Sequence, residues 1–313
     1  MILGIGIFSL PYILNLVIKN TTAPEKVKQF PVTVNPKNKT IIENKIVDEY
    51  LENTGSPLQA AVGNVFWDTF KWLALSIADM PLYQSIAAVD GRFVNIKPGM
   101  RKEQVAKIFK KTLGWSDQGK KDFLNPEKYA TLPLEEGSFA PGIYFLNSKT
   151  DPQTAQDMVN KRFTDDVLSR YSTSTAEIVP LNQALTIASL IQRETGGNED
   201  MRLISGIIWN RIFNKMNLQI DATLQYAKVG STDTNNWWPD VKPADKYLKS
   251  PYNTYLHAGL PPTPIANPSV AAVVAALNPT KTSCLFYFHD KDGAIHCTNT
   301  YKEHVTLLKQ YYK

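Results

Sequence analysis

Apolar residues recur at helical spacing in the middle of the chain, and the pattern predicts two successive helices. The first has an apolar face at the i, i+3, i+4, i+7 spacing of a buried stripe: Ala184, Ile187, Ala188 and Ile191. Gly196 and Gly197 should end this helix. Asn198 can cap a second helix running to about Phe213, with a buried face of Ile204, Ile207, Ile208 and Ile212. The two helices should meet at a corner, where a cleft can open.

Glu194 continues the apolar stripe of the first helix. It follows Ile191 by three residues and Ile187 by seven, which places it within roughly 20° of the stripe. Burial and the negative end of the helix dipole both disfavour a carboxylate at this position. We therefore expect the pKa of Glu194 to be raised, as a general acid requires. The alternative is a glutamate that bends out to solvent or pairs with Arg193 or Arg211.

A short alternating strand at Arg92–Ile96 precedes a Lys97–Gly99 turn and a helix over Gln104–Lys111. This strand–turn–helix order is similar to the opening of a LysM-like module, a small fold that binds N-acetylglucosamine polymers. A turn-rich aromatic segment follows at Leu134–Tyr144. An amphipathic helix is then expected over Asp151–Ser169, capped by Asp151 or Thr154, with one buried stripe of Ala155, Met158, Val159 and Phe163.

The C-terminal third alternates between extended segments and short regular elements. Leu218–Thr223 should be extended, and Lys228–Tyr255 should form a long polar loop whose aromatic residues suit sugar rings. Gly259–Pro268 is rich in proline and should be a stiff wall. Three elements complete the pattern: a small-residue helix over Ser269–Leu277, a hairpin of Leu285–His289 with Ala294–Thr298, and a helix over Tyr301–Tyr312.

The first 18 residues are almost continuously apolar and just long enough to span a bilayer. No small-residue cleavage site follows, so we expect an uncleaved anchor over residues 1–19; a cleaved signal peptide and an amphipathic core helix are the alternatives. No Lys or Arg precedes the span, which is unusual for a cytoplasmic flank. Residues 20–44 indicate a linker, and Leu58–Ala88 has a mostly helical pattern interrupted at Pro81.

Composition narrows the function only slightly. A hydrophobic content of 43%, a charged content of 20% and a net charge of +5 are typical of a globular protein. No basic run with interleaved aromatics is present, which argues against nucleic acid. The four histidines lack metal-ligand spacing. The two cysteines, Cys284 and Cys297, flank the expected hairpin and could form a disulfide or remain separate thiols.

Several segments occur together in an order that resembles the MltG/YceG-like family of bacterial endolytic murein transglycosylases. They are Ile187–Gly196, Gly206–Arg211, Met216–Thr223, Ser250–Pro268, Ala275–Pro279 and Phe286–His304, and Leu134–Phe163 is similar to a further family segment. Three motif positions depart from the family pattern: Ala222 and Ser269 replace a proline and a glycine, and the segment at Pro141–Tyr144 lacks its aspartate.

The resemblance implies an α+β fold with an N-terminal membrane anchor, a small LysM-like subdomain and a mixed helix-and-hairpin catalytic domain. The implied divisions are residues 1–19, 20–90, 91–175 and 176–313. Glu194 would be the catalytic acid/base and no cofactor would be needed. The motif positions expected to line the cleft are Gln219, Asp221, Tyr252, Asn253, Thr254 and Tyr255.

The implied reaction cleaves the N-acetylmuramic acid–N-acetylglucosamine bond within a glycan strand and leaves a 1,6-anhydro end. It would take place outside the cytoplasm of a bacterium, from a single-pass anchor in the inner membrane through residues 1–18. Termination of nascent strands and contact with peptidoglycan synthases would accompany it. Two alternatives stay open: a two-carboxylate peptidoglycan hydrolase that uses Asp221, and a glycan-binding scaffold without catalysis.

Overall fold

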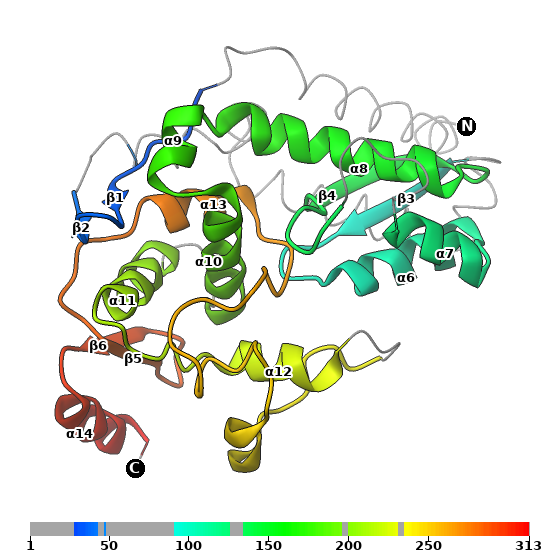
Figure 1. Ribbon diagram of the computed structural model, residues 1–313. Helices are drawn as coiled ribbons and strands as arrows, with labels where there is room; N and C mark the ends of the chain where they lie inside the picture. Colours follow the sequence, from blue (N-terminus) through cyan, green and yellow to red (C-terminus); the bar gives the residue numbers. More distant parts are fainter. Residues whose placement is uncertain are drawn as a thin grey trace, which may run out of the picture.

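The computed structural model describes residues 28–42, 47, 91–125, 134–195, 200–230 and 235–312, which form a mixed α+β molecule (Figure 1). The predicted anchor over residues 1–19 and the helical pattern over Leu58–Ala88 lie outside these residues. Within the described ranges, every helix is too short or too polar to cross a membrane. The N-terminal part of these ranges contains a two-stranded pair, β1 (Val34–Asn35) with β2 (Thr40–Ile41).

A small α/β unit is formed by residues 91–166, at the right of Figure 1. Strands β3 (Gly91–Ile96) and β4 (Gly142–Asn147) pair antiparallel, with Phe93 opposite Phe145. Helices α6 (Lys102–Leu113), α7 (Asp117–Leu124) and α8 (Pro152–Asp166) pack with this pair around a separate core. Its centre is aromatic, with Phe109 and Phe123 stacked at 4.7 Å between ring centroids. The strand, turn and helix expected over residues 92–111 are thus confirmed.

A second core holds the helices around α10 (Leu181–Glu194). Helix α10 packs on α13 (Val270–Leu277) and α11 (Met201–Phe213), and every residue from Ala184 to Ile191 is buried. Two short elements, η2 (Leu168–Arg170) and α9 (Thr173–Ile178), lead from α8 into α10. The first predicted helix is therefore confirmed, and it ends at the expected glutamate.

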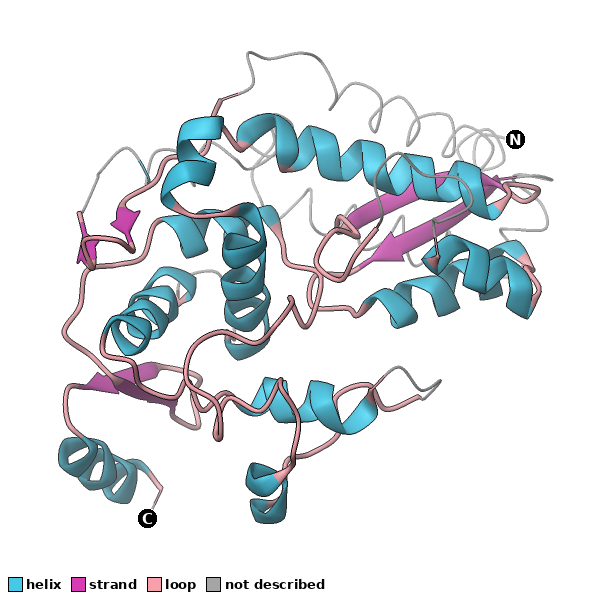
Figure 2. Cartoon of the chain, viewed as in Figure 1, coloured by secondary structure: helices cyan, strands magenta, loops and turns pink. Residues whose placement is uncertain are grey.

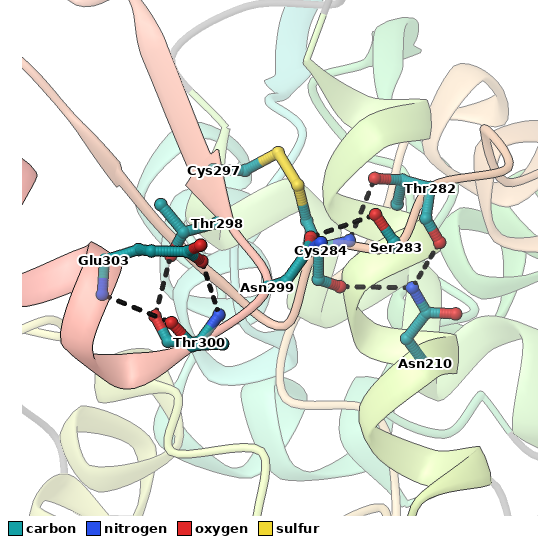
Figure 3. Close-up of a disulfide and its surroundings, with 9 residues drawn as sticks. All are labelled: Asn210, Thr282, Ser283, Cys284, Cys297, Thr298, Asn299, Thr300 and Glu303. Atoms are coloured by element: carbon teal, nitrogen blue, oxygen red, sulfur yellow. Dashed lines mark hydrogen bonds between the residues drawn. A yellow bond between two sulfur atoms is a disulfide. The ribbon is translucent and has the colours of Figure 1, made fainter.

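The C-terminal part surrounds the end of α10, as the arrangement in Figure 2 shows. It consists of α12 (Asp221–Val229), η3 (Pro243–Tyr247), the antiparallel hairpin of β5 (Phe286–His289) with β6 (Ile295–Thr298), and α14 (Tyr301–Tyr311). A disulfide joins Cys284 to Cys297 across the base of the hairpin (Figure 3). The predicted hairpin and terminal helix are confirmed, and the cysteines are bonded rather than separate.

Four local predictions were wrong. Residues Asp221–Thr223 are not extended but open α12, because a carboxylate suits the positive end of a helix dipole. The turn-rich segment continues into strand β4, whose pairing with β3 no local pattern indicates. Met158 is 36% exposed, and the fully buried neighbour is Gln156, which donates to the carbonyl of Phe123. Helix α11 begins at Met201 with Asp200 in the N-cap position, so Asn198 is not its cap.

Candidate active site

Glu194 is the last helical residue of α10, and its carboxyl faces the β5–β6 hairpin. The chain leaves the helix at Thr195, whose backbone is extended. Glu194 is half-buried, and its Oε2 accepts a hydrogen bond of 2.6 Å from the hydroxyl of Tyr287 on β5. Desolvation raises the pKa of Glu194, and the Tyr287 hydrogen bond offsets part of that rise because it favours the charged form. Glu194 is therefore suited to hold a proton for transfer.

Of the alternatives expected for Glu194, pairing with an arginine is not found among the described residues. Its carboxylate makes no salt bridge there with Arg193 or Arg211. The Arg193 guanidinium lies 3.9 Å from the ring centroid of Trp238. Both arginines are desolvated, which lowers their pKa from the ordinary value.

A second carboxyl–tyrosine pair stands close enough to act on the first. Asp221 is the first residue of α12, is exposed, and accepts a 2.6 Å hydrogen bond from the hydroxyl of Tyr255. The negative charge of Asp221 adds to the rise in the pKa of Glu194. Desolvation and the bond to Asp221 raise the pKa of Tyr255, so this phenol remains a donor at neutral pH. The site thus combines two carboxyls and two phenols that interact electrostatically.

Arg211 on α11 joins the two sides of this site. Its Nε donates to the carbonyl of Leu285, 2.6 Å away, just before β5. Its Nη1 donates to the carbonyl of Leu218, 2.5 Å away, in the segment that leads to Asp221. The residue is 7% exposed; its bond to Leu218 is buried and its bond to Leu285 is part-buried. Arg211 therefore fixes the spacing between the strand that carries Tyr287 and the helix that carries Asp221.

The other residues expected to line the cleft differ in their surroundings. Gln219 is exposed, with a positive φ of 53°, and its backbone N–H donates to the carbonyl of Thr254. Asn253 is fully buried and donates to the carbonyls of Lys246 and Leu248. The structure therefore places Gln219 at the surface and Asn253 inside the loop.

The remaining two residues also make internal bonds. The hydroxyl of Thr254 accepts from the backbone N–H of Ile220 and bonds with the hydroxyl of Thr223. The hydroxyl of Tyr252 bonds with that of Thr263 at 2.8 Å. These contacts shape the loop that presents Tyr255. Among the six cleft candidates, Asp221 and Tyr255 interact electrostatically with Glu194.

Sequence reasoning missed Tyr287 and His289. They alternate along β5 with Phe286 and Phe288 and therefore share one face of the strand. His289 lies with its Nε2 at 3.2 Å from Oδ2 of Asp200, and its charge lowers the pKa of Glu194 when it is protonated. The sequence signal that could have pointed to them is the strand alternation in Phe286–His289. That alternation assigns side chains to the two faces of the strand but does not show what each face contacts. Within the described part of the chain, no three His, Cys, Asp or Glu side chains are grouped to hold a metal ion.

The sequence profile of the YceG-like family matches residues 75–310, which include the core of the small unit, most of the core around α10 and the whole site. The chain belongs to the YceG-like family. It is similar to the endolytic murein transglycosylase of Bacillus subtilis (strain 168), with 33% identity over 67% of this chain and 58% of the relative. The Streptococcus pneumoniae (strain D39) protein of the same name is 31% identical over 54% of this chain and 31% of its own length.

The YceG-like fold is also shared with a solved structure. A putative YceG-like protein from Listeria monocytogenes matches with a TM-score of 0.59 and 26% identity, over 69% of this chain and 75% of that one. The chain spans less than two thirds of the length of the curated relatives it matches. Family membership therefore rests on the matched region, in which Glu194 and its tyrosine partner lie.

Proposed function

We propose that this YceG-like protein is an endolytic lytic transglycosylase that cleaves the N-acetylmuramic acid–N-acetylglucosamine bond of peptidoglycan. The observation that carries the proposal is the proton-holding carboxyl of Glu194 at the end of α10, desolvated and bonded to a phenol. The relatives named endolytic murein transglycosylase support the substrate class.

The proposed reaction uses one protein carboxyl and a nucleophile on the substrate. Glu194 donates its proton to the glycosidic oxygen as the bond between that oxygen and muramoyl C1 breaks. The carboxylate that remains takes the proton of the muramoyl C6 hydroxyl, whose oxygen forms the new bond to C1. The product is a 1,6-anhydro end, no water is consumed, and Glu194 regains its proton for the next cycle.

The closest rival is a hydrolase in which Asp221 activates water. Two observations weaken it: Asp221 is exposed at the start of α12, and a lone pair of its Oδ1 is occupied by the Tyr255 hydroxyl. In our proposal Asp221 and Tyr255 orient the sugar, as does Gln219 at the surface nearby. Tyr252, Asn253 and Thr254 support the loop through the bonds described above. A glycan-binding scaffold would not require a carboxyl that holds a proton.

Product analysis on purified glycan strands tests the proposal. We expect fragments ending in 1,6-anhydro-N-acetylmuramic acid, whose mass is one water lower than that of the reducing-end product. Glu194→Gln keeps the shape of the side chain but has no proton to donate, so the folded variant should lose essentially all turnover. Asp221→Asn should lose only about ten- to hundredfold, the equivalent of roughly 1–3 kcal/mol of hydrogen bonding.

Each rival predicts a different result. Predominantly hydrated ends that borohydride reduces, with Asp221→Asn as damaging as Glu194→Gln, would establish the hydrolase. Binding of strands without any cleavage would establish the scaffold. More than a few per cent of wild-type turnover in folded Glu194→Gln would remove Glu194 from the reaction altogether.

The proposal extends to the arrangement of the whole chain. Residues 1–19 would anchor the protein in the bacterial inner membrane, residues 20–90 would lead out from it, and the catalytic region over 176–313 would lie outside the cytoplasm. Residues 91–175 would form a LysM-like subdomain, supported by the order of β3, turn and α6. Cleavage within nascent strands would end their elongation, beside peptidoglycan synthases.

A variant that lacks residues 1–19 should be a soluble, folded protein. If this variant does not fold, residues 1–19 are part of the fold and the proposed anchor is wrong.

A further inference from the structure

We propose that Tyr287 is a positioning residue that selects which oxygen of Glu194 carries the catalytic proton. Its hydroxyl donates to Oε2 at 2.6 Å. An oxygen that accepts this bond serves as the carbonyl oxygen of the neutral acid, which leaves the proton on Oε1. The same bond holds the side chain in one rotamer, so that a single oxygen first donates a proton and then takes one back. This inference rests on the proposed function of Glu194.

The phenol is fit for this role at any working pH. Tyr287 has a pKa raised well above its ordinary value, first by desolvation and then by the charge of Glu194 and the bond to it. It therefore keeps its proton and remains a donor to Oε2 of Glu194. Arg211 holds strand β5, which carries Tyr287, at its first residues. It donates to the carbonyl of Leu285, and its guanidinium lies 5.3 Å from the ring centroid of Phe286. The position of the hydroxyl is thus set by the backbone of β5 and not by solvent.

The other titratable groups that interact with Glu194 come from four elements and one loop. Arg193 adjoins it on α10, and Asp221 and Tyr255 come from α12 and the loop after η3. Arg211 comes from α11, and His289 shares the strand face of Tyr287. His289 acts on Glu194 through its charge. The pH experiment on Tyr287 is therefore repeated in a background in which residue 289 carries no imidazole.

The experiment compares Tyr287→Phe with the wild type by the pH profile of kcat/KM, in the full chain and again with His289→Gln. A donor to the charged carboxylate lowers its pKa, so removing the donor should raise it. Because Glu194 must be protonated to act, the descending alkaline limb should move to higher pH. At fixed pH, kcat should fall about tenfold or more with KM little changed, since a positioning bond is lost.

Fluorinated tyrosine at position 287 gives the opposite perturbation without changing shape. The fluorinated phenol is a stronger donor, so the alkaline limb should move to lower pH. Tyr171→Phe is the matched control, because it removes a part-buried phenol that bonds to the carbonyl of Val179 outside the site; its profile should equal the wild type. If the alkaline limb of the kcat/KM profile stays in place in both Tyr287→Phe and the fluorotyrosine variant, the proposal is overturned. A raised KM with unchanged kcat would also overturn it, because it would show that Tyr287 binds substrate.

Two measurements separate this proposal from the proposed function. In Glu194→Gln, adding Tyr287→Phe should leave the glycan Kd unchanged; a further loss of affinity would show direct contact with substrate. The titration of the Glu194 side-chain carbon by ¹³C NMR needs no turnover. If the wild type cleaves nothing, the proposed function fails, whereas the NMR titration still shows whether Tyr287 sets the protonation of Glu194.

Discussion

At the scale of single residues, Glu194 occupies a position that is unfavourable for a charged group. It stands at the C-terminal end of α10, desolvated, and its one described hydrogen bond is to Tyr287. The folded protein therefore holds the Glu194 proton to higher pH than the unfolded chain does. Between the unfolded and folded pKa values the native state binds more protons, so stability falls as pH rises through that window. The proposed catalytic role and the stability of the fold make opposite demands on this residue.

This conflict predicts that Glu194→Gln stabilises the protein above that window. The amide stays neutral and its carbonyl can accept the bond from Tyr287, so the desolvation cost of the carboxylate disappears. The variant should have a higher Tm than the wild type at neutral and alkaline pH, with the difference vanishing in acid, where Glu194 is protonated in both states. Scanning calorimetry across pH measures it. A Tm difference that is independent of pH would show that the carboxyl is not desolvated.

Periodicity placed Glu194 on the apolar stripe with Ile187 and Ile191, and the family resemblance gave it the expected catalytic role. Tyr287 was beyond reach, since alternation assigns it to a strand face without showing which carboxyl lies opposite. The motif match had the reverse weakness. It included Asn253 and Thr254 with Asp221, although Asn253 bonds within its own loop and Thr254 bonds to the start of α12. A match to a family motif does not show whether a residue contacts the substrate or supports the loop that does.

At the scale of elements, α11 determines where the hairpin starts. Figure 3 shows Asn210 donating to the carbonyls of Thr282 and Cys284. Arg202, about two helical turns earlier on α11, donates to the carbonyl of Asn278. Between them, Gly206 lets the segment approach closely. A Cβ there would lie 2.3 Å from the carbonyl oxygen of Thr280. The helix and the segment before β5 are thus in direct backbone contact.

Gly206→Ala should therefore destabilise the protein, despite the higher helix propensity of alanine. The new methyl group meets backbone and not a flexible side chain, so the two elements must separate, at a cost of about 1–3 kcal/mol. Because β5 carries Tyr287, kcat should fall as well. Urea unfolding and turnover measure both effects. Ser205→Ala is the control: its buried hydroxyl has no described partner, so its removal should leave stability and kcat close to wild type. Equal effects of the two substitutions would contradict the close approach.

The elements that the sequence predicted well are those defined by local signals. Helix α13 begins after Ser269, which caps it, and α14 begins with a Thr300–Glu303 capping box. Strand β4 lacked such a signal because its stability comes from β3, some fifty residues earlier in sequence. The start of α12 was hidden for a similar reason, since Ile220 is held by Thr254 from a distant loop.

At the scale of the whole molecule, Asn267 joins the small α/β unit to the helices around α10. Its Oδ1 accepts from the backbone N–H groups of Gly137 and Phe139, at 3.0 and 2.9 Å. Its Nδ2 donates to the carbonyl of Met100, 2.8 Å away, and its backbone bonds with Gly99 and Met100. The residue is fully buried. One asparagine side chain therefore satisfies three backbone groups of the other unit.

A buried arginine makes a second connection. Arg101, 1% exposed, donates to the carbonyl of Gly230 and lies with its guanidinium 4.2 Å from the ring centroid of Tyr226. Beside it, Glu136 has a pKa raised well above its usual range by burial and by the nearby Glu103. The junction is thus polar but desolvated, and each of its bonds is costly to lose. This geometry holds the small unit against the loop region that follows α12.

Asn267→Ala should therefore loosen the junction before it unfolds either unit. It leaves the buried N–H groups of Gly137 and Phe139 without partners, which costs about 1–3 kcal/mol each. The carbonyl of Met100 keeps its bond from the backbone N–H of residue 267. Limited proteolysis should cut between the units, and thermal unfolding should broaden or split, because each unit keeps its own core. Asn267→Asp sharpens the test: it keeps the acceptor for Gly137 and Phe139 but places an oxygen against the carbonyl of Met100 and beside Glu136.

We expect Asn267→Asp to be at least as damaging as Asn267→Ala, and less damaging in acid, where the new carboxyl can donate. Asn299→Ala is the matched control, since that exposed asparagine only accepts a bond from the hydroxyl of Ser283; its unfolding should equal the wild type. A single sharp transition in all three variants, with unchanged proteolysis, would mean that the two units are held together by apolar packing and not by this asparagine.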